Sequence, residues 1–354
     1  MLACMLPLLL TGCWDRKDPE DRAFIITLGV DKTADAFRFS FAPANIETGE
    51  ADVYTAEART LAEAVAQVDC RTSRKTDLGQ LKTVILSADL LREADRMHAF
   101  LRELERSRTV SEKVMLLATE DAAADCVEAV MAEDSRTGLF LWDFYKNTAG
   151  EVAVTKGLDL DTFLTEWEEQ GKCAVLPRIL AEETEEAKEK TEEKPKKLRL
   201  GGGMAITEDT AYFLNDAEER GYLFLLGEAE GALLETEYGG EVLPLAVNKS
   251  RVRYDFMPLQ EGRLLCSITL PLAGALQGGT GGFLSEETHE AIKLCFEREI
   301  REEVERTLMR AQSAGRDLFG ILPRAAQAGY EVKWEQLSFE VLPQLELKDI
   351  GRRR

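Results

Sequence analysis

The first part of the chain alternates apolar and polar positions in a way that predicts strands. Residues 22–30 are apolar and rich in β-branched side chains, and a turn-forming segment follows at 31–35. Three phenylalanines then alternate with polar or small residues: Phe37, Phe39 and Phe41. This pattern is typical of a β-hairpin. Further apolar runs predict strands at 81–87 and 114–118.

Helical periodicity appears between and after these strands. Thr60 is followed three residues later by Glu63, which predicts a capping box at the start of a helix. Apolar residues at helical spacing follow: Leu61, Ala64, Val65 and Val68. Two more helices are predicted at 88–106 and 120–132. Because the order of elements mixes hairpins with crossovers, we expect an α+β fold with mixed and antiparallel sheets and packed helices.

The second half of the chain combines short strands with one long helix. Six strands are predicted: 201–206, 210–214, 242–247, 249–254, 263–270 and 337–345. We expect the third and fourth of these to pair with each other, and residues 218–226 fit either a short helix or a strand. The long helix near the C-terminus lies between Ser285, a suitable N-cap, and Gly315, a suitable end. Its apolar stripe predicts the buried face: Ile292, Phe296, Ile300, Val304 and Leu308.

A charged tract divides these two halves. Residues 182–199 hold almost no apolar side chain, so they cannot bury a face and are expected to form a solvated hinge. At 354 residues the chain exceeds the length of one typical domain, and we expect three. The predicted parts are a signal at 1–12, an N-terminal α+β domain at 13–180, a charged linker or hinge at 181–199, a small middle α+β domain at 200–248 and a C-terminal α+β domain at 249–354.

The first residues have the features of a lipoprotein signal. Residues 1–10 carry no charge, and at about 1.5 Å per residue they are too short to span a hydrocarbon core of roughly 30 Å. Small residues, Thr11 and Gly12, then precede Cys13, as at a signal cleavage site. We expect the mature chain to begin at Cys13 with an acylated sulfur. The alternative is that this segment is a buried strand or helix.

Charge narrows the classes of partner. The formal net charge of -21 opposes contact with phosphate backbones and anionic headgroups, so we expect no nucleic-acid partner. After the first ten residues no apolar run reaches the ~18 residues that a transmembrane helix needs. Membrane contact therefore depends on the lipid at Cys13. Two acyl chains, at about 0.8 kcal/mol per buried CH₂, outweigh the repulsion.

Residues suited to catalysis or metal binding are few. The two histidines, His98 and His289, lie far apart in sequence within predicted helices. Two sets of neighbouring acids recur by chance in a chain with 65 acidic residues: Asp159 with Asp161, and Glu168 with Glu169. The glycine-rich segment 278–282 lacks the Gly-Lys-Ser/Thr ending of a phosphate loop. We therefore expect no catalytic residues and no cofactor.

The cysteines add no metal site. Of seven, Cys4 is expected to leave with the signal and Cys13 to be acylated. The remaining five form no C-x-x-C pair: Cys70, Cys126, Cys173, Cys266 and Cys295. Neither a disulfide framework nor a zinc site is expected, and isolated cysteines of this kind are usually small buried apolar residues.

Several separate motifs follow one another along the chain. The first is Cys13-Trp14-Asp15, with the strand that ends in Gly29-Val30-Asp31-Lys32. Further motif positions come later: Leu81 and Lys82, Arg220 and Gly221, and Gln312 with Asp317. In this order they resemble the Ger(x)C family of spore germination lipoproteins, the C subunits of nutrient germinant receptors, whose lipidated start the first motif matches. Gln80 departs from the pattern, because the family usually has a histidine before the Leu-Lys pair.

The resemblance implies a three-domain α+β protein attached by lipid to the outer face of the spore inner membrane. The expected partners are two integral membrane subunits, A and B, with which it triggers germination without catalysis of its own. The alternatives are an extracytoplasmic solute-binding lipoprotein of a transporter and a cell-wall hydrolase. Which germinant is sensed, and whether this subunit contacts it, stays open.

Overall fold

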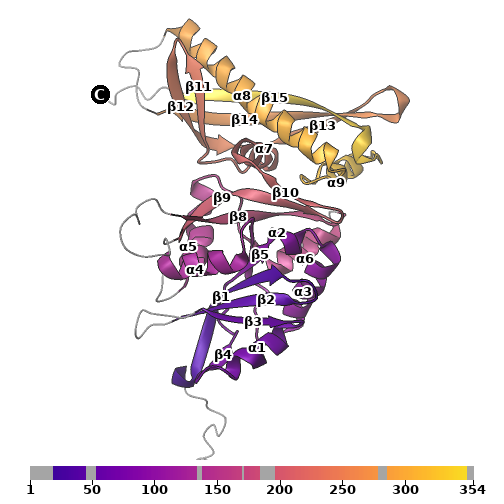
Figure 1. The fold of residues 1–354 in the computed structure, drawn as a ribbon. Helices are drawn as coiled ribbons and strands as arrows, with labels where there is room; N and C mark the ends of the chain where they lie inside the picture. Colours follow the sequence, from indigo (N-terminus) through magenta and orange to yellow (C-terminus); the bar gives the residue numbers. More distant parts are fainter. Residues whose placement is uncertain are drawn as a thin grey trace, which may run out of the picture.

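The computed structural model describes residues 19–44, 53–133, 138–169, 171–183, 196–277 and 285–348, which form two sheets covered by helices (Figure 1). In this part of the chain the larger sheet has ten strands, with the order β10-β9-β8-β6-β5-β1-β2-β3; β4 pairs with β1, and β7 pairs with β6. Its strands are β1 (Arg22–Lys32), β2 (Phe37–Pro43), β3 (Tyr54–Ala58), β4 (Lys75–Asp77), β5 (Thr83–Ser87), β6 (Met115–Thr119), β7 (Leu158–Asp159), β8 (Cys173–Glu183), β9 (Lys196–Thr207) and β10 (Ala211–Leu214).

Helices cover both faces of the larger sheet. One apolar core receives side chains from α1 (Leu61–Asp69), α2 (Ala88–Leu91), α3 (Ala94–Arg106) and α6 (Leu160–Glu169). The opposite core receives them from α4 (Ala123–Glu133) and α5 (Phe140–Asn147). The predicted β-hairpin is confirmed, since β1 and β2 pair antiparallel. Thr60 caps α1 as predicted, because its hydroxyl accepts the Glu63 N–H. The predicted capping box is incomplete, since the Glu63 carboxylate accepts the N–H of Arg59 and not that of Thr60.

The predicted helix at 88–106 is broken in two. Its backbone leaves helical geometry at Glu93 (φ -107°, ψ 81°), which separates α2 from α3. Both helices bury apolar side chains in the same core: Leu90 and Leu91 on α2, and Met97, Phe100, Leu101 and Leu104 on α3.

The smaller sheet contains β11 (Leu233–Tyr238), β12 (Glu241–Ser250), β13 (Arg253–Pro258), β14 (Leu264–Leu276) and β15 (Leu337–Lys348). The chain reaches β15 through the long helix α8 (Glu286–Ser313), and β14 and β15 pair in parallel. Ser285 caps α8 and its predicted stripe is buried. Two shorter helices, α7 (Asp216–Leu226) and α9 (Ile321–Gln327), pack into the same core.

The predicted pairing of 242–247 with 249–254 is wrong. The segment Asn248–Ser250 contains no glycine or proline to reverse the chain, so β12 continues through a register shift between Val247 and Lys249. The long strand β14 instead pairs with both segments, using Leu272–Leu276 for β12 and Leu264–Thr269 for β13.

Strands of one sheet flank the charged tract. Strands β8 and β9 pair antiparallel up to Glu183 and Lys196, so the chain enters and leaves 184–195 through neighbouring strands of one sheet. The end of this sheet then contributes to the core under α7 and α8 through four side chains: Cys173, Val175, Ala205 and Leu214. The α+β class with mixed sheets and a long C-terminal helix is confirmed, and the division into domains stays a prediction.

Candidate functional site: the junction between the two sheets

The predicted motif positions lie at separate places in the fold. Gly29 and Asp31 are on β1, Leu81 and Lys82 precede β5, and Arg220 and Gly221 are on α7. Two more lie at and after the end of α8: Gln312 and Asp317. The predicted signal and the positions Cys13, Trp14 and Asp15 lie outside the described residues, as does the glycine-rich segment 278–282.

Asp31 fixes the N-terminus of α4 to the sheet. Its two carboxylate oxygens accept the backbone N–H groups of Ala123 (2.7 Å) and Ala124 (3.1 Å), which have no acceptor within the helix. Burial raises the pKa of the Asp31 carboxyl, and these two N–H groups oppose that shift. Gly29 lets the helix approach the strand, because a Cβ there would lie 2.8 Å from Cγ2 of Val127. Both positions therefore join β1 to α4.

Leu81 and Lys82 connect the central strands. The Lys82 N–H donates to the carbonyl of Ile26, and its carbonyl accepts the N–H of Met115, both at 2.8 Å. Its ammonium lies 5.8 Å from the ring centroid of Trp142 on α5. Leu81 is buried in the core. The backbone of this motif thus bridges β1 and β6.

Arg220 and Gly221 join α7 to α8. The Arg220 Nε donates to both carboxylate oxygens of Glu303, each at 3.1 Å. Burial raises the pKa of the Glu303 carboxyl, and the guanidinium opposes that shift. Gly221 faces Thr307, whose hydroxyl donates to the carbonyl of Glu218 at 3.0 Å. The motif therefore supports a close contact between two helices.

Gln312 and Asp317 hold the chain after α8. The Gln312 amide donates to the carbonyl of Leu337 at the start of β15. The Asp317 carboxylate accepts N–H groups from Phe319 (3.0 Å) and Leu322 (2.6 Å) around the start of α9. Burial raises the pKa of this carboxyl, and the backbone N–H groups oppose the shift.

A buried acid that the sequence reasoning missed lies where the two sheets meet. Glu219 on α7 is 6% exposed, and its Oε1 accepts both the N–H and the hydroxyl of Thr155, each at 2.7 Å. Its Oε2 accepts the N–H of Gly202 on β9, also at 2.7 Å. One carboxylate thus connects α7, strand β9 next to the edge of the larger sheet, and the loop before β7. We call Thr155, Gly202 and Glu219 the junction cluster.

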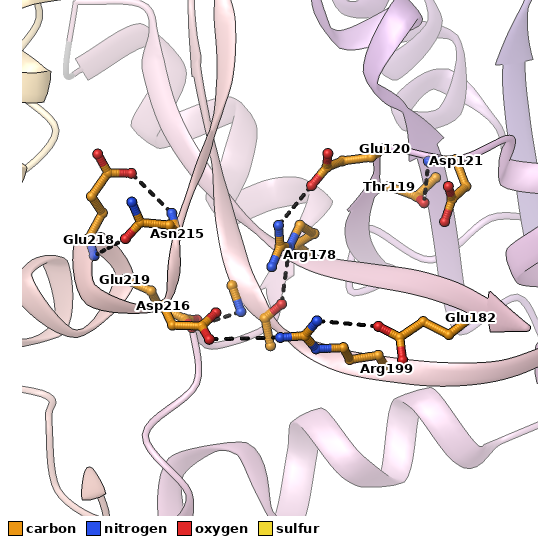
Figure 2. Close-up of polar contacts among 12 residues, drawn as sticks. Thr119, Glu120, Asp121, Arg178, Glu182, Arg199, Asn215, Asp216, Glu218 and Glu219 are labelled. Carbon is orange, nitrogen blue, oxygen red and sulfur yellow. Dashed lines mark hydrogen bonds and ion pairs between the residues drawn. The ribbon is translucent and has the colours of Figure 1, made fainter. Parts of the chain in front are cut away.

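Arg178 lies beside the junction cluster (Figure 2). This arginine on β8 is 9% exposed and donates to the carbonyl of Gly201 (3.3 Å) and to Glu120 (2.7 Å). A Cβ at Gly202 would lie 2.6 Å from Nε of Arg178, and the φ of Gly202 is 88°. Both the close approach and the backbone conformation therefore favour glycine at this position. The Gly201-Gly202-Gly203 run was the available signal for this close approach.

The loop at 149–157 strengthens the same junction. Lys156 forms an ion pair with Glu228 after α7 at 2.9 Å. A Cβ at Gly231, which has a φ of 86°, would lie 2.0 Å from the carbonyl oxygen of Glu151. The loop therefore packs tightly on the part of the chain that carries the smaller sheet.

The ionisable groups of the junction are engaged by the protein itself. Arg199 pairs with Glu182 and Asp216 (Figure 2), as Arg178 pairs with Glu120. No three metal-ligating side chains form a group in the part of the chain that the structure describes. The geometry is that of a hydrogen-bonded joint, which can hold the two sheets in one orientation.

The other candidate residues are spread over the fold. His98 on α3 lies 3.6 Å from Glu168, whereas His289 on α8 contacts the carbonyl of Leu347. Asp159 and Asp161 both pair with Lys113 at 3.3 and 3.2 Å. These acids tie the start of α6 to the loop before β6.

Two family models match consecutive parts of the chain: the spore germination protein N-terminal domain at residues 15–181 and the spore germination B3/GerAC-like C-terminal domain at residues 202–348. Two proteins of Bacillus subtilis (strain 168) are similar. The putative spore germination protein YfkR is 22% identical, covering 94% of this chain and 91% of its own, and spore germination protein KC is 19% identical, covering 98% and 91%.

The fold is similar to that of the crystal structure of the GerBC protein. The TM-score is 0.57 at 15% sequence identity, over 92% of this chain and 97% of that one. At this identity the likeness concerns the fold alone. The two family models together match residues 15–181 and 202–348, which include every predicted motif from Asp15 to Asp317, so the chain belongs to the Ger(x)C family of spore germination proteins.

Proposed function

We propose that this chain is the lipid-anchored, non-enzymatic C subunit of a spore nutrient germinant receptor. In this proposal Cys13 holds it at the outer face of the spore inner membrane, where it assembles with the integral membrane A and B subunits. The observation that carries the proposal is the match of both halves to spore germination families, beginning two residues after Cys13, the residue that we expect to be acylated.

The physical role of the anchor is to raise local concentration. No helix among the described residues has the length and apolar character needed to cross a membrane, and the net charge of -21 opposes anionic headgroups. Acyl chains on Cys13 confine the domain to a thin layer above the bilayer, so weak contacts with membrane subunits suffice for assembly.

Replacing the anchoring cysteine tests the attachment. Cys13→Ala should move the chain from the membrane to the soluble fraction of spore lysates and reduce nutrient-triggered germination, with circular dichroism unchanged. Cys70→Ala is the matched control, because Cys70 is exposed at the end of α1 and should leave retention and germination as they are. An unchanged membrane fraction for Cys13→Ala would contradict the anchor.

Crosslinking in dormant spores tests the assembly. Lysine-reactive crosslinking of the wild-type chain should recover the A and B subunits by mass spectrometry, and the same treatment of the Cys13→Ala chain should recover less. Recovery of neither subunit from the wild-type chain, in spores whose membrane fraction contains it, would count against assembly while leaving the anchor intact.

A further inference from the structure

A groove lies between α1 and α3, beside β4 and close to the start of β1. Its volume is about 730 Å³, within the range of pockets that hold small ligands. Apolar side chains from both helices and the loop after β4 line it: Leu61, Ala62, Val65, Leu78 and Ala99. The groove can therefore receive the apolar body of a small molecule.

One residue that lines the groove has a buried hydroxyl without a partner. Thr76 on β4 is 6% exposed, and its Oγ1 has no hydrogen-bond partner among the described residues. Leaving such a buried polar atom unpaired costs about 1–3 kcal/mol, so most buried hydroxyls in proteins are bonded. A ligand oxygen that reaches Oγ1 of Thr76 from the groove would satisfy this hydroxyl.

The charges at the rim favour an anion. The two acids are already engaged: Asp77 binds Arg22 and the N–H of Gly79, and Glu103 accepts the N–H of Leu61. Two exposed cations, Lys75 and Arg106, line the groove and form no ion pair with any described residue. The lining holds three cations, Arg22, Lys75 and Arg106, against two acids, Asp77 and Glu103, and so carries a net charge of +1 in a chain whose net charge is -21.

We propose that this groove binds a small amphiphilic anion. Its carboxylate or phosphate head pairs with Lys75 and Arg106 and accepts the hydroxyl of Thr76, while its apolar body lies between α1 and α3. Charge-assisted hydrogen bonds to such a head are about twice as strong as neutral ones, so the head group sets the selectivity. The proposal is independent of the anchor and of the partner subunits.

Matched six-carbon probes test the head group. Calorimetric titration of the full chain carrying Cys13→Ala, which avoids acylation and detergent, should show one site for hexanoate and for hexyl phosphate. Hexan-1-ol should bind at least roughly tenfold more weakly, the equivalent of one lost charge-assisted bond, and hexylammonium should bind still less. Equal binding of the alcohol and the anions, or no binding of either anion, would overturn the proposal.

Substitutions locate the site. Lys75→Ala combined with Arg106→Ala should weaken hexanoate binding at least tenfold, and Thr76→Val should weaken it several-fold, because the valine keeps the shape and removes only the hydroxyl. Thr76→Val should leave the thermal midpoint unchanged or raised, since no protein bond is lost. Ala62→Trp should block the groove from an exposed helix position. Lys249→Ala, which removes an exposed lysine on β12, is the control for charge. An equal loss of hexanoate binding in this variant would contradict the site.

The anion can come from solution or from a lipid headgroup, and a competition separates the two. Displacement of hexanoate by phosphatidylglycerol vesicles, but not by phosphatidylcholine vesicles, would assign the groove to a lipid headgroup. Retention of hexanoate in the presence of both vesicles would assign it to a soluble amphiphile. Displacement by both vesicles alike would show that charge does not select the occupant and would overturn the proposal.

Discussion

The Arg220 guanidinium forms a bidentate pair with the Glu303 carboxylate across 83 positions of sequence, and this pair joins α7 to α8. The Glu303 side chain is 10% exposed and that of Arg220 is 30% exposed. The two residues are not equivalent, because Glu303 is the more buried partner. Removing the arginine leaves a buried negative charge that neither water nor a cation compensates. The Arg-Gly motif of the sequence is therefore a helix-packing element.

Arg220→Ala should lower the free energy of unfolding by about 3 kcal/mol, because it leaves the buried Glu303 without its partner. Replacing both residues, with Arg220→Met and Glu303→Leu, should recover most of that loss, because no unpaired charge then remains buried. Urea unfolding at pH 7 measures both. If the double variant were as unstable as Arg220→Ala, loss of packing rather than the stranded charge would be the cause.

Gly221→Ala should separate α7 from α8. The added Cβ would lie 2.2 Å from Oγ1 of Thr307 and 2.7 Å from the carbonyl oxygen of Glu303, and the second atom belongs to helix backbone that cannot rotate away. We expect a loss of about 2 kcal/mol in the free energy of unfolding. Gly150→Ala is the control, since nothing lies within 4 Å of a Cβ there.

A second substitution tests the cause of this loss. Thr307→Ala removes one of the two clashing atoms, so adding it to Gly221→Ala should restore part of the stability, as a coupling energy in a double-mutant cycle. Strictly additive losses would contradict a direct clash between these two positions.

Glu219→Ala should loosen the joint between the sheets. It leaves three buried donors without an acceptor, on Thr155 and Gly202, at a cost of about 2–4 kcal/mol. Hydrogen exchange should rise at residues 149–157 and 201–203 before it rises elsewhere. Glu230→Ala, an exposed acid in the loop after α7, is the control. Uniform exchange changes across the chain would indicate global destabilisation and not a local joint.

Local chemistry explains which elements the sequence could predict. The caps at Thr60 and Ser285 each depend on a hydroxyl and an N–H three residues away, and the α8 stripe depends on helical periodicity alone. Such signals lie within a few residues, so one sequence reveals them. The hairpin of β1 and β2 is equally local.

The parts that escaped prediction depend on distant residues. The junction cluster joins Thr155 to Glu219 across 64 positions, and the pairing of β8 with β9 spans the charged tract. The periodicity of a strand does not determine which other strand pairs with it. The sequence also does not distinguish a buried glutamate such as Glu219 from an exposed one. The three glycines at 201–203 indicated that another group packs closely against this backbone, but not that this group is the side chain of Arg178.

Asp317 should make stability fall as pH rises. Burial raises its native pKa above the ordinary value of 3.8, so the folded chain holds this proton more tightly than the unfolded chain does. Its contribution is complete below pH 3.8 and is lost as the pH rises through the raised native pKa. Asp317→Asn cannot ionise and keeps one acceptor for the N–H groups at α9. The free energy of unfolding of wild type minus that of Asp317→Asn should therefore decrease between pH 4 and pH 7.

Urea unfolding at several pH values in this range measures that difference. Asp255→Asn, at an exposed position on β13, is the control: it gives the change in the free energy of unfolding when a surface aspartate is neutralised. A difference that grows with pH would mean that the ionised form is the one the fold prefers, and would contradict the effect of burial.

Thiol reactivity should separate the buried from the exposed cysteines. Burial raises the pKa of the thiols of Cys126, Cys173 and Cys266 to about 12, so at pH 8 only about one in ten thousand is a thiolate, the form that reacts. Cys70 is exposed. Iodoacetamide on the folded chain at pH 8 should modify Cys70 within minutes and the other three only after urea is added, as read by peptide mass spectrometry. Comparable labelling of Cys173 in the folded chain would mean that the core between the two sheets opens, because this thiol lies buried there and donates to the carbonyl of Asp317.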